Sequence, residues 1–211
     1  MKSLLSIILV ALSSLFLISC GNPYDSYYGS SSIYGGSSYL SGFEQTQPGQ
    51  APLTHNGQAA PRGYWDDEGV TGSPKIRINL HDQRAYFYKG GTLVGVAPIS
   101  TGSDGHGTPR GSFKVTQKSI DHASNLYGVI KDKATGQTIV SDADTRKHKA
   151  GPGEVFVHAP MPYFMRFNGA IGMHAGFLPG YPASHGCVRL PEEMAKLFFH
   201  NASNGTPVIV D

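Results

Sequence analysis

The run RAYFYKGGTLVGVAPIS, residues 84–100, has the pattern of a β-hairpin. Two segments rich in β-branched, aromatic and small apolar residues, 84–88 and 92–100, flank a Lys-Gly-Gly turn. Immediately upstream, KIRINL at 75–80 alternates apolar and polar residues with the period of two that is typical of a half-buried strand. These residues therefore predict that the folded domain opens with antiparallel β-strands.

Downstream of the hairpin, short β-like runs alternate with turns, and the 27 glycines and 14 prolines are typical of turn-rich β-structure. One helix is expected: it begins near Pro191, carries Glu192 and Glu193 in its first turn, presents an apolar stripe and ends near Asn201 or at Asn204-Gly205. We therefore predict a mainly β domain, a sandwich or barrel-like fold with one or two short helices, over residues 74–211. The further strands are expected at 112–120, 136–141, 154–159, 170–175 and 206–211.

The first residues have the pattern of a secretory leader. A short positive start precedes the apolar run 4–17, which is too short to span a membrane comfortably as a mature helix. The run ends in Leu-Ile-Ser-Cys, which resembles the bacterial lipobox, so residues 1–19 are expected to be a signal peptide and Cys20 a lipidated N-terminus. The alternative is an ordinary signal peptide that happens to contain a cysteine. Residues 20–73, rich in Gly, Ser, Tyr and Pro, are expected to form a flexible tether.

Charge and glycine patterns exclude some functions. The net charge of +2 implies no nucleic-acid partner. The glycine-rich stretch GSDGHGTPRG at 102–111 does not fit the dinucleotide-binding pattern, and it precedes a strand rather than a helix. It is therefore expected to be a turn, and no cofactor is expected.

The most reactive side chain stands in SHGCVRLP, residues 184–191. Cys187 could be a nucleophile, a metal ligand, half of a disulfide or a small core residue. If Cys20 carries lipid, Cys187 has no cysteine left to pair with. A zinc site is disfavoured because neither C-x-x-C nor H-E-x-x-H spacing is present, and we expect no metal. Among the four alternatives we favour the nucleophile.

A nucleophilic thiol needs a base, because the thiolate is the reactive form. His185, two residues before the cysteine, is a poor candidate unless the backbone turns sharply between them. His174 lies thirteen residues upstream, across a Gly/Pro-rich stretch that can fold back, and is the expected base. Gly186 permits close backbone approach, and the amides of Gly186 and Cys187 are expected to face a developing oxyanion.

The stretch MHAGFLPGYPASHGCVRLP, residues 173–191, resembles the YkuD-type L,D-transpeptidase catalytic domain family. The signature of that family is a histidine followed downstream by Ser/Thr-His-Gly-Cys, a hydrophobic residue and Arg or Asn. It is matched here by His174 and residues 184–189, and the resemblance extends through most of residues 75–211. The stretch between the histidine and the serine is shorter than in many members, and because that loop shapes the pocket, the resemblance leaves the substrate preference open.

The resemblance implies a reaction on peptidoglycan. Cys187 would attack the carbonyl after the third residue of a stem tetrapeptide and expel D-Ala, with His174 as general base and acid. A main-chain carbonyl is expected to orient the histidine, because position 175 is Ala. Five further residues are expected to brace the motif, meet the substrate or line the cleft: Ser184, His185, Arg189, Tyr163 and Met161.

Several alternatives stay open. Arg189 could equally pin a loop, and Tyr163 could equally be a core residue. The acyl group could pass to an amine, giving a 3–3 crosslink or the attachment of a wall lipoprotein, or it could pass to water. The non-enzyme alternative is an inactive wall-binding lipoprotein, which the presence of both Cys187 and His174 disfavours.

The expected partners are peptidoglycan stem peptides, a wall-attached lipoprotein as one possible acceptor, and a membrane reached through the N-terminal lipid. The expected location is the periplasmic side of the cell envelope. For a Gram-negative cell, the outer membrane is favoured because Gly21, and not Asp, follows Cys20.

Overall fold

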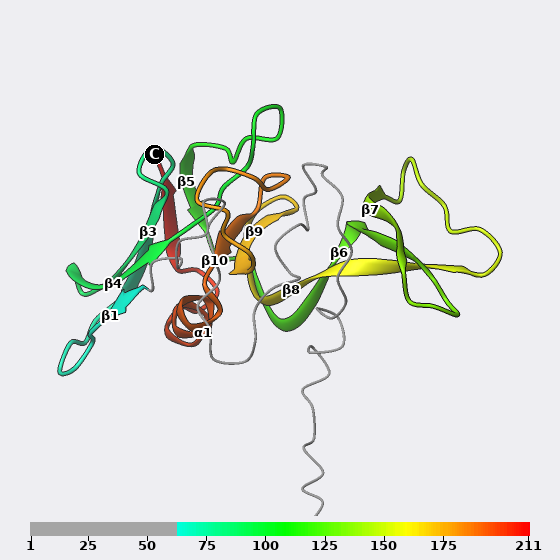
Figure 1. Cartoon of the computed structure of the whole chain (residues 1–211). Helices are drawn as coiled ribbons and strands as arrows, with labels where there is room; N and C mark the ends of the chain where they lie inside the picture. The colour runs from blue at the N-terminus through cyan, green and yellow to red at the C-terminus, as the bar shows by residue number, and fades with distance from the viewer. Residues whose placement is uncertain (1–62) are drawn as a thin grey trace, which may run out of the picture. The chain divides into compact units, whose positions relative to one another are not determined.

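The computed structural model describes residues 63–211, and the predicted signal peptide, Cys20 and most of the predicted tether lie outside the described residues. Two sheets and one helix make up the described region, which confirms the predicted mainly β class (Figure 1). The first sheet contains, in spatial order, β1 (Tyr64–Trp65), β4 (Thr92–Pro98), β3 (Arg84–Lys89), β2 (Pro74–Asn79), β11 (Pro207–Val210) and β5 (Gly111–Lys114). The second sheet contains β10 (Val188–Leu190), β9 (Ile171–Ala175), β8 (Glu154–Asn168), β6 (Gln117–Asp132) and β7 (Thr138–Asp144).

The predicted hairpin forms as β3 and β4, and β2 pairs antiparallel with the other side of β3. The alternation of apolar and polar residues in β2 places the apolar side chains in the core, as predicted. Ile76 and Ile78 are fully buried, whereas Arg77 between them forms an ion pair with Asp211 at the protein surface. The period of two thus decides which face of the first sheet enters the core.

The run 112–120, predicted as one strand, serves both sheets. β5 pairs with β11 in the first sheet, and β6 pairs with β8 in the second. The chain changes sheet at Val115 and Thr116, because the N–H of Val115 donates to the carbonyl of Thr206 and the N–H of Thr116 donates to the carbonyl of Arg166. The prediction of a single strand is therefore wrong, since consecutive residues bond to backbones of different sheets.

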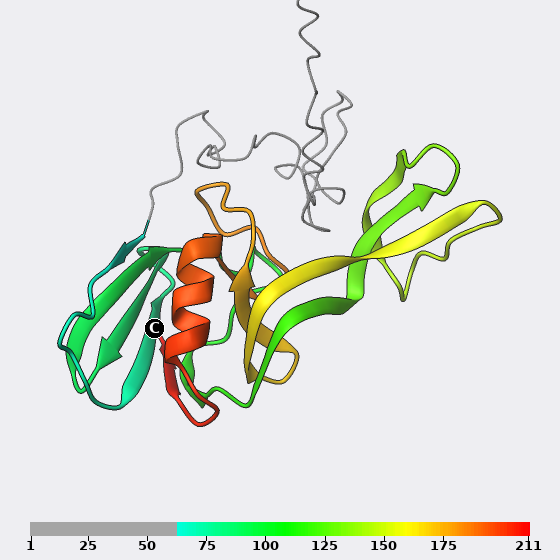
Figure 2. The same cartoon turned by 90° about the horizontal axis from the view of Figure 1, so that it is seen from below.

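The helix α1 (Glu192–Asn201) lies between the two sheets (Figure 2). Pro191 stands at its start, and Glu192 and Glu193 place negative charge at the positive end of the helix dipole, as predicted. In the described part of the chain, no helix is long and apolar enough to cross a membrane. The core that the helix completes contains apolar side chains from both sheets, including Phe87, Val94, Val208, Met165, Met173 and Leu190.

The first sheet begins with β1, upstream of residue 74 where the domain was expected to start. β1 pairs with β4, and Trp65 packs against Phe87 and Phe198 with ring centroids 5.2 and 5.9 Å apart. Gly95 leaves the space for the indole, because a Cβ there would lie 2.4 Å from the Trp65 ring. Two residues from the last part of the predicted tether therefore pair with the first sheet.

The strands β6 and β8, of 16 and 15 residues, continue away from the helix as a two-stranded ribbon that carries β7 (Figure 2). The ladder between them is interrupted: Ala123 lies opposite Pro160, and the next pair is Gly128 with His158. Residues 124–127 thus stand against a single residue of β8, which is a large bulge in β6. The ribbon was not predicted at this length, and its bulge ends at a residue that contacts the predicted catalytic motif.

Candidate active site

Two parallel neighbours, β9 and β10, bring the predicted nucleophile and base together. His174 pairs with Arg189, and Cys187 is the residue just before β10. Extending this register by one residue places Cys187 opposite Gly172. Because Gly172 is two residues before His174 on β9, the side chains of Cys187 and His174 lie on the same face of the sheet. A strand spacing of about 4.8 Å and a two-residue step of about 6.6 Å separate the two Cα atoms by roughly 8 Å, which a thiol and an imidazole can span.

His174 is buried, and its ring is held by backbone. Its Nδ1 lies 2.7 Å from the carbonyl oxygen of Ala175. Because a carbonyl oxygen can only accept, Nδ1 carries the proton, and the neutral ring presents Nε2 as a bare acceptor. Within residues 63–211, Nε2 has no hydrogen-bond partner. The expected main-chain orienter is thus the carbonyl of Ala175, and Nε2 is the atom that can take a proton.

The two groups are both neutral at rest. Burial lowers the pKa of His174 to about 3, against an opposing contribution from the hydrogen bond with Ala175. Cys187 is half-buried, and burial raises the pKa of its thiol above the ordinary value, opposed by a hydrogen bond with the backbone of Gly172. The resting pair is therefore a thiol beside a neutral imidazole, so proton transfer has to accompany nucleophilic attack.

The turn before the cysteine is locked by the buried hydroxyl of Ser184. This hydroxyl donates to the carbonyl of Cys187 at 2.5 Å and accepts from the N–H of Gly186 at 3.1 Å. Gly186 has a φ of 110°, which a residue with a Cβ adopts only with strain. The N–H of Gly186 is therefore occupied. This corrects the expected pair of oxyanion donors, of which the N–H of Cys187 remains.

Thr108, which lies in the predicted turn and was not among the predicted site residues, holds the same peptide. Its buried hydroxyl donates to the carbonyl of Gly186 at 2.8 Å and accepts from the N–H of Gly102 at 3.0 Å. The carbonyl of Gly186 and the N–H of Cys187 belong to one planar peptide unit, so Thr108 also fixes the direction of that N–H. The available signal was the Thr-Pro-Arg-Gly sequence at 108–111, which predicts a turn but not this contact.

Arg189 is buried and pins the loop between β9 and β10. Its Nη1 donates to the carbonyl of Phe177 at 3.3 Å, and its Nη2 donates to the carbonyl of Ala183 at 3.0 Å. Of the two roles left open for this arginine, these contacts support the loop-pinning role.

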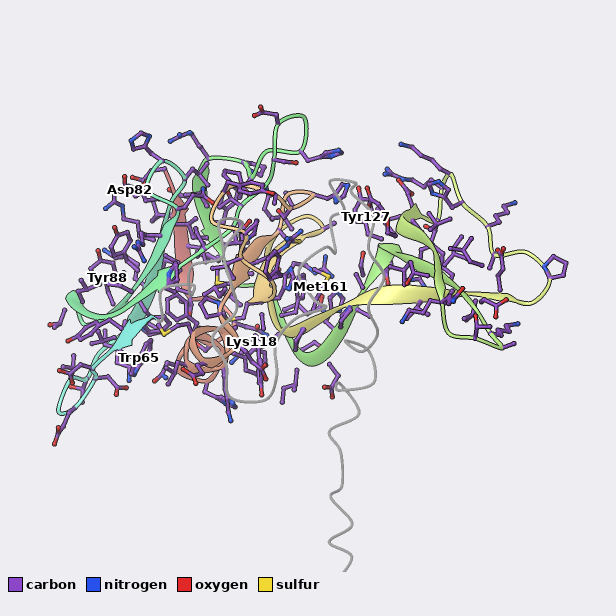
Figure 3. The ribbon with its side chains drawn as sticks, in the orientation of Figure 1. Trp65, Asp82, Tyr88, Lys118, Tyr127 and Met161 are labelled. Atoms are coloured by element: carbon purple, nitrogen blue, oxygen red, sulfur yellow. The ribbon has the colours of Figure 1, made fainter. Side chains whose placement is uncertain are left out.

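His185 contacts the ribbon rather than standing alone beside the thiol. Its ring stacks on the ring of Tyr127 from β6, with centroids 4.1 Å apart and an interplanar angle of 23°. Tyr127 is labelled in Figure 3. On another side it meets His106, with centroids 4.6 Å apart. Burial lowers the pKa of His185. Through these contacts His185 braces the motif against the ribbon and the loop of His106, which is one of its expected roles.

Tyr163 and Met161, both expected in the cleft, lie on β8. Tyr163, with a φ of 57°, packs edge-on against Phe199 and His200 of α1, with centroids 5.8 and 6.3 Å apart. Of the two alternatives for Tyr163, these contacts favour the core role. Met161 is buried and pairs with His122 of β6. Its contact with a substrate stays a prediction.

The model of the YkuD L,D-transpeptidase catalytic domain matches residues 73–210. The chain therefore belongs to this family, as its Ser-His-Gly-Cys motif predicted. The probable L,D-transpeptidase ErfK/SrfK of Salmonella typhimurium is 31% identical over 149 residues, which cover 64% of this chain and 44% of that protein. The protein of the same name from Escherichia coli is 30% identical over the same shares. The chain thus spans less than half the length of these curated relatives.

Solved structures show the same fold. An L,D-transpeptidase in complex with imipenem superposes with a TM-score of 0.50 at 16% identity, covering 66% of this chain and 59% of that one. At this identity the likeness concerns the arrangement of the strands and the helix, and the chemistry has to be argued from the residues of this chain.

Proposed function

We propose that this chain is a peptidoglycan L,D-transpeptidase that works through a thioester on Cys187. The observation that carries the proposal is the state of His174. Its Nδ1 is bound to the carbonyl of Ala175, and its buried Nε2 is left as an acceptor on the strand face shared with Cys187. A base held in this way can take a thiol proton without first reorienting its ring.

In the first half-reaction, Sγ of Cys187 attacks the carbonyl carbon of the third residue of a stem tetrapeptide while Nε2 of His174 takes the thiol proton. The carbonyl oxygen becomes an oxyanion, which the N–H of Cys187 stabilises by a hydrogen bond. The C–N bond to D-Ala then breaks, and the imidazolium returns the proton to the leaving amine. D-Ala departs, and a thioester remains on the enzyme.

In the second half-reaction, an amine attacks the thioester and gives its proton to His174. The C–S bond breaks, and the departing sulfur of Cys187 takes the proton back. An amine from another stem peptide gives a 3–3 crosslink, an amine from a lipoprotein attaches that lipoprotein to the wall, and water gives hydrolysis. We favour an amine, because the related ErfK/SrfK proteins are named as transpeptidases.

The proposal includes the location of the enzyme. The leader pattern supports a lipid on Cys20, and the outer membrane is favoured by Gly21. A flexible tether of about 50 residues has a typical end-to-end distance of roughly 40 Å, which would let an anchored domain work away from its membrane. Replacing Cys20 by Ala is expected to move the protein from the membrane fraction to the soluble fraction of the envelope. Retention in the membrane would contradict the lipid anchor.

The reaction is tested by incubating the purified enzyme with tetrapeptide muropeptides and separating the products. We expect release of D-Ala and a thioester on Cys187 that is detected by mass spectrometry. Crosslinked dimers would identify a stem-peptide acceptor, and tripeptides would identify water. If neither D-Ala release nor an adduct is found, the proposed function is wrong.

A further inference from the structure

A cavity of about 180 Å³ lies beside the catalytic motif, where β6 and β7 approach the ring of His185. At about 30 Å³ for each water molecule in the liquid, this volume has room for roughly six waters or one small polar group. Its wall is polar and carries charges of both signs. The residues that matter here are His185, Tyr127, Asp142, Asp144, Arg146 and Lys147.

Two of the charged residues bind each other. The guanidinium of Arg146 contacts both carboxylate oxygens of Asp144, with Nη2 2.6 Å from Oδ2 and Nε 2.9 Å from Oδ1. This pairing holds the pKa of Asp144 well below its usual range. Arg146 also donates to the hydroxyl of Tyr127 at 3.3 Å. The pair is thus part of the wall, and it leaves one carboxylate, Asp142, and one ammonium, Lys147, outside that pairing.

We infer that the cavity binds a zwitterionic amino-acid group, with the ammonium at Asp142 and the carboxylate at Lys147. A simple anion would match only Lys147, and a simple cation would match only Asp142, whereas a zwitterion matches both. The five heavy atoms of such a group fit the available volume. Asp142 and Lys147 are both exposed, so each ion pair is modest by itself, and a zwitterion gains by making both at once.

The source of this group rests on the proposed function. A stem peptide with diaminopimelate as its third residue carries a zwitterion at the end of that residue's side chain, three methylenes from the Cα next to the attacked carbonyl. His185, which lines the cavity, is separated from Cys187 only by Gly186. A donor peptide with its carbonyl at Cys187 can therefore direct its side chain to the cavity. The same group on an acceptor peptide is the second source.

The test compares two tetrapeptides that differ in the third residue, meso-diaminopimelate or L-lysine, because lysine has the ammonium but lacks the carboxylate. Acylation of Cys187 is followed by intact-protein mass spectrometry for wild type, Lys147→Gln and Asp142→Asn. We expect Lys147→Gln to lower kcat/KM by roughly twofold to fivefold for the diaminopimelate peptide, mainly through KM, and to leave kcat/KM for the lysine peptide unchanged. Asp142→Asn should lower kcat/KM for both peptides, because both carry the ammonium. Lys133 is an exposed lysine between β6 and β7 that lies outside the cavity wall. Lys133→Gln is therefore the matched control and should change kcat/KM for neither peptide.

A carbapenem separates this inference from the proposed function, because it acylates the nucleophile but carries no diaminopimelate side chain. All four proteins should form the carbapenem adduct at the same rate. A wild type without any adduct would overturn the proposed function, whereas equal effects of Lys147→Gln on the diaminopimelate and lysine peptides in both acylation and transfer would overturn only the zwitterion site. If Lys147→Gln spares acylation but slows transfer of the acyl group to meso-diaminopimelate more than to L-lysine, the site holds the zwitterion of the acceptor. If it slows neither step selectively, the cavity does not recognise a zwitterion.

Discussion

Replacing Thr108 by Val tests how the fold holds the oxyanion donor. Valine keeps the branched shape but removes the hydroxyl that joins the N–H of Gly102 to the carbonyl of Gly186. Each buried polar group that loses its partner costs about 1–3 kcal/mol, and Gly102 is only partly buried. We therefore expect the free energy of unfolding to fall by about 2–4 kcal/mol.

The same change should slow acylation, because the peptide between Gly186 and Cys187 loses the contact that fixes its plane. Removing an oxyanion donor outright costs about a hundredfold to a thousandfold in rate. Here the donor is loosened and not removed, so we expect about a tenfold to hundredfold loss. Urea unfolding measures the stability, and mass spectrometry measures carbapenem adduct formation at low denaturant, where every variant is folded.

Thr108→Ser is the matched control, since it keeps the hydroxyl and should retain most of the stability and rate. If Thr108→Val is destabilised but acylates at the wild-type rate, the argument that Thr108 directs the N–H of Cys187 is refuted. If Val and Ser variants are equally slow, the methyl group and not the hydroxyl is responsible.

Three further predictions concern other parts of the site and the fold. Because burial lowers the pKa of His174 to about 3, the unfolded chain binds a proton that the folded chain does not between pH 6.5 and 3, so stability is lost as pH falls through this window. Urea unfolding across this window should show that the free energy of unfolding of wild type falls by up to about 1.4 kcal/mol per pH unit more than that of His174→Asn. Parallel curves for the two proteins would show that the histidine is not buried as a neutral ring. Trp65→Ala should lower the free energy of unfolding by about 2–3 kcal/mol, less than the roughly 3–5 kcal/mol of a fully buried tryptophan because Trp65 is only half-buried. A change below about 0.5 kcal/mol would mean that β1 is not part of the fold. Arg189→Met removes the donors to two loop carbonyls, so hydrogen exchange of the Ala183 and Ser184 amides, which donate to Thr101, should accelerate while exchange in β2 stays unchanged. Unchanged exchange in the loop would contradict the pinning role.

Local patterns predicted the parts of the fold that depend on neighbours along the chain. The alternation at 75–80, the Lys-Gly-Gly turn and the acidic first turn of α1 each specify an element, and each appears where it was expected. The helix start at Pro191 also follows from the local chemistry of helix ends.

The rest depends on contacts between distant residues, which no local pattern encodes. The chain leaves one sheet for the other at Val115 because backbones near residues 166 and 206 are close by in space. Trp65 joins the core because Gly95, thirty residues away, leaves room for its ring. A short polar and aromatic segment of this kind resembles the tether that precedes it, so the strand β1 was not predicted.

In the candidate active site, too, local patterns predicted some residues, and others depend on contacts between distant residues. The motif predicted Cys187 as the nucleophile, and its spacing to a second histidine predicted His174 as the base, because both residue types carry the chemistry themselves. Thr108 could not be found in this way, since its role depends on reaching a carbonyl 78 residues away along the chain. The prediction of Gly186 as an oxyanion donor is corrected for the same reason: the hydroxyl of Ser184 takes its N–H in the folded turn.

We propose Cys187 as the nucleophile and His174 as its base. The most direct measurement is the mass of the purified domain after incubation with a carbapenem, with the adduct mapped by peptide digestion, for wild type, Cys187→Ala and His174→Ala. We predict one adduct on the peptide that contains Cys187 in wild type, none on Cys187→Ala, and strongly slowed formation on His174→Ala. An adduct on Cys187→Ala, or equal rates for wild type and His174→Ala, would contradict the account.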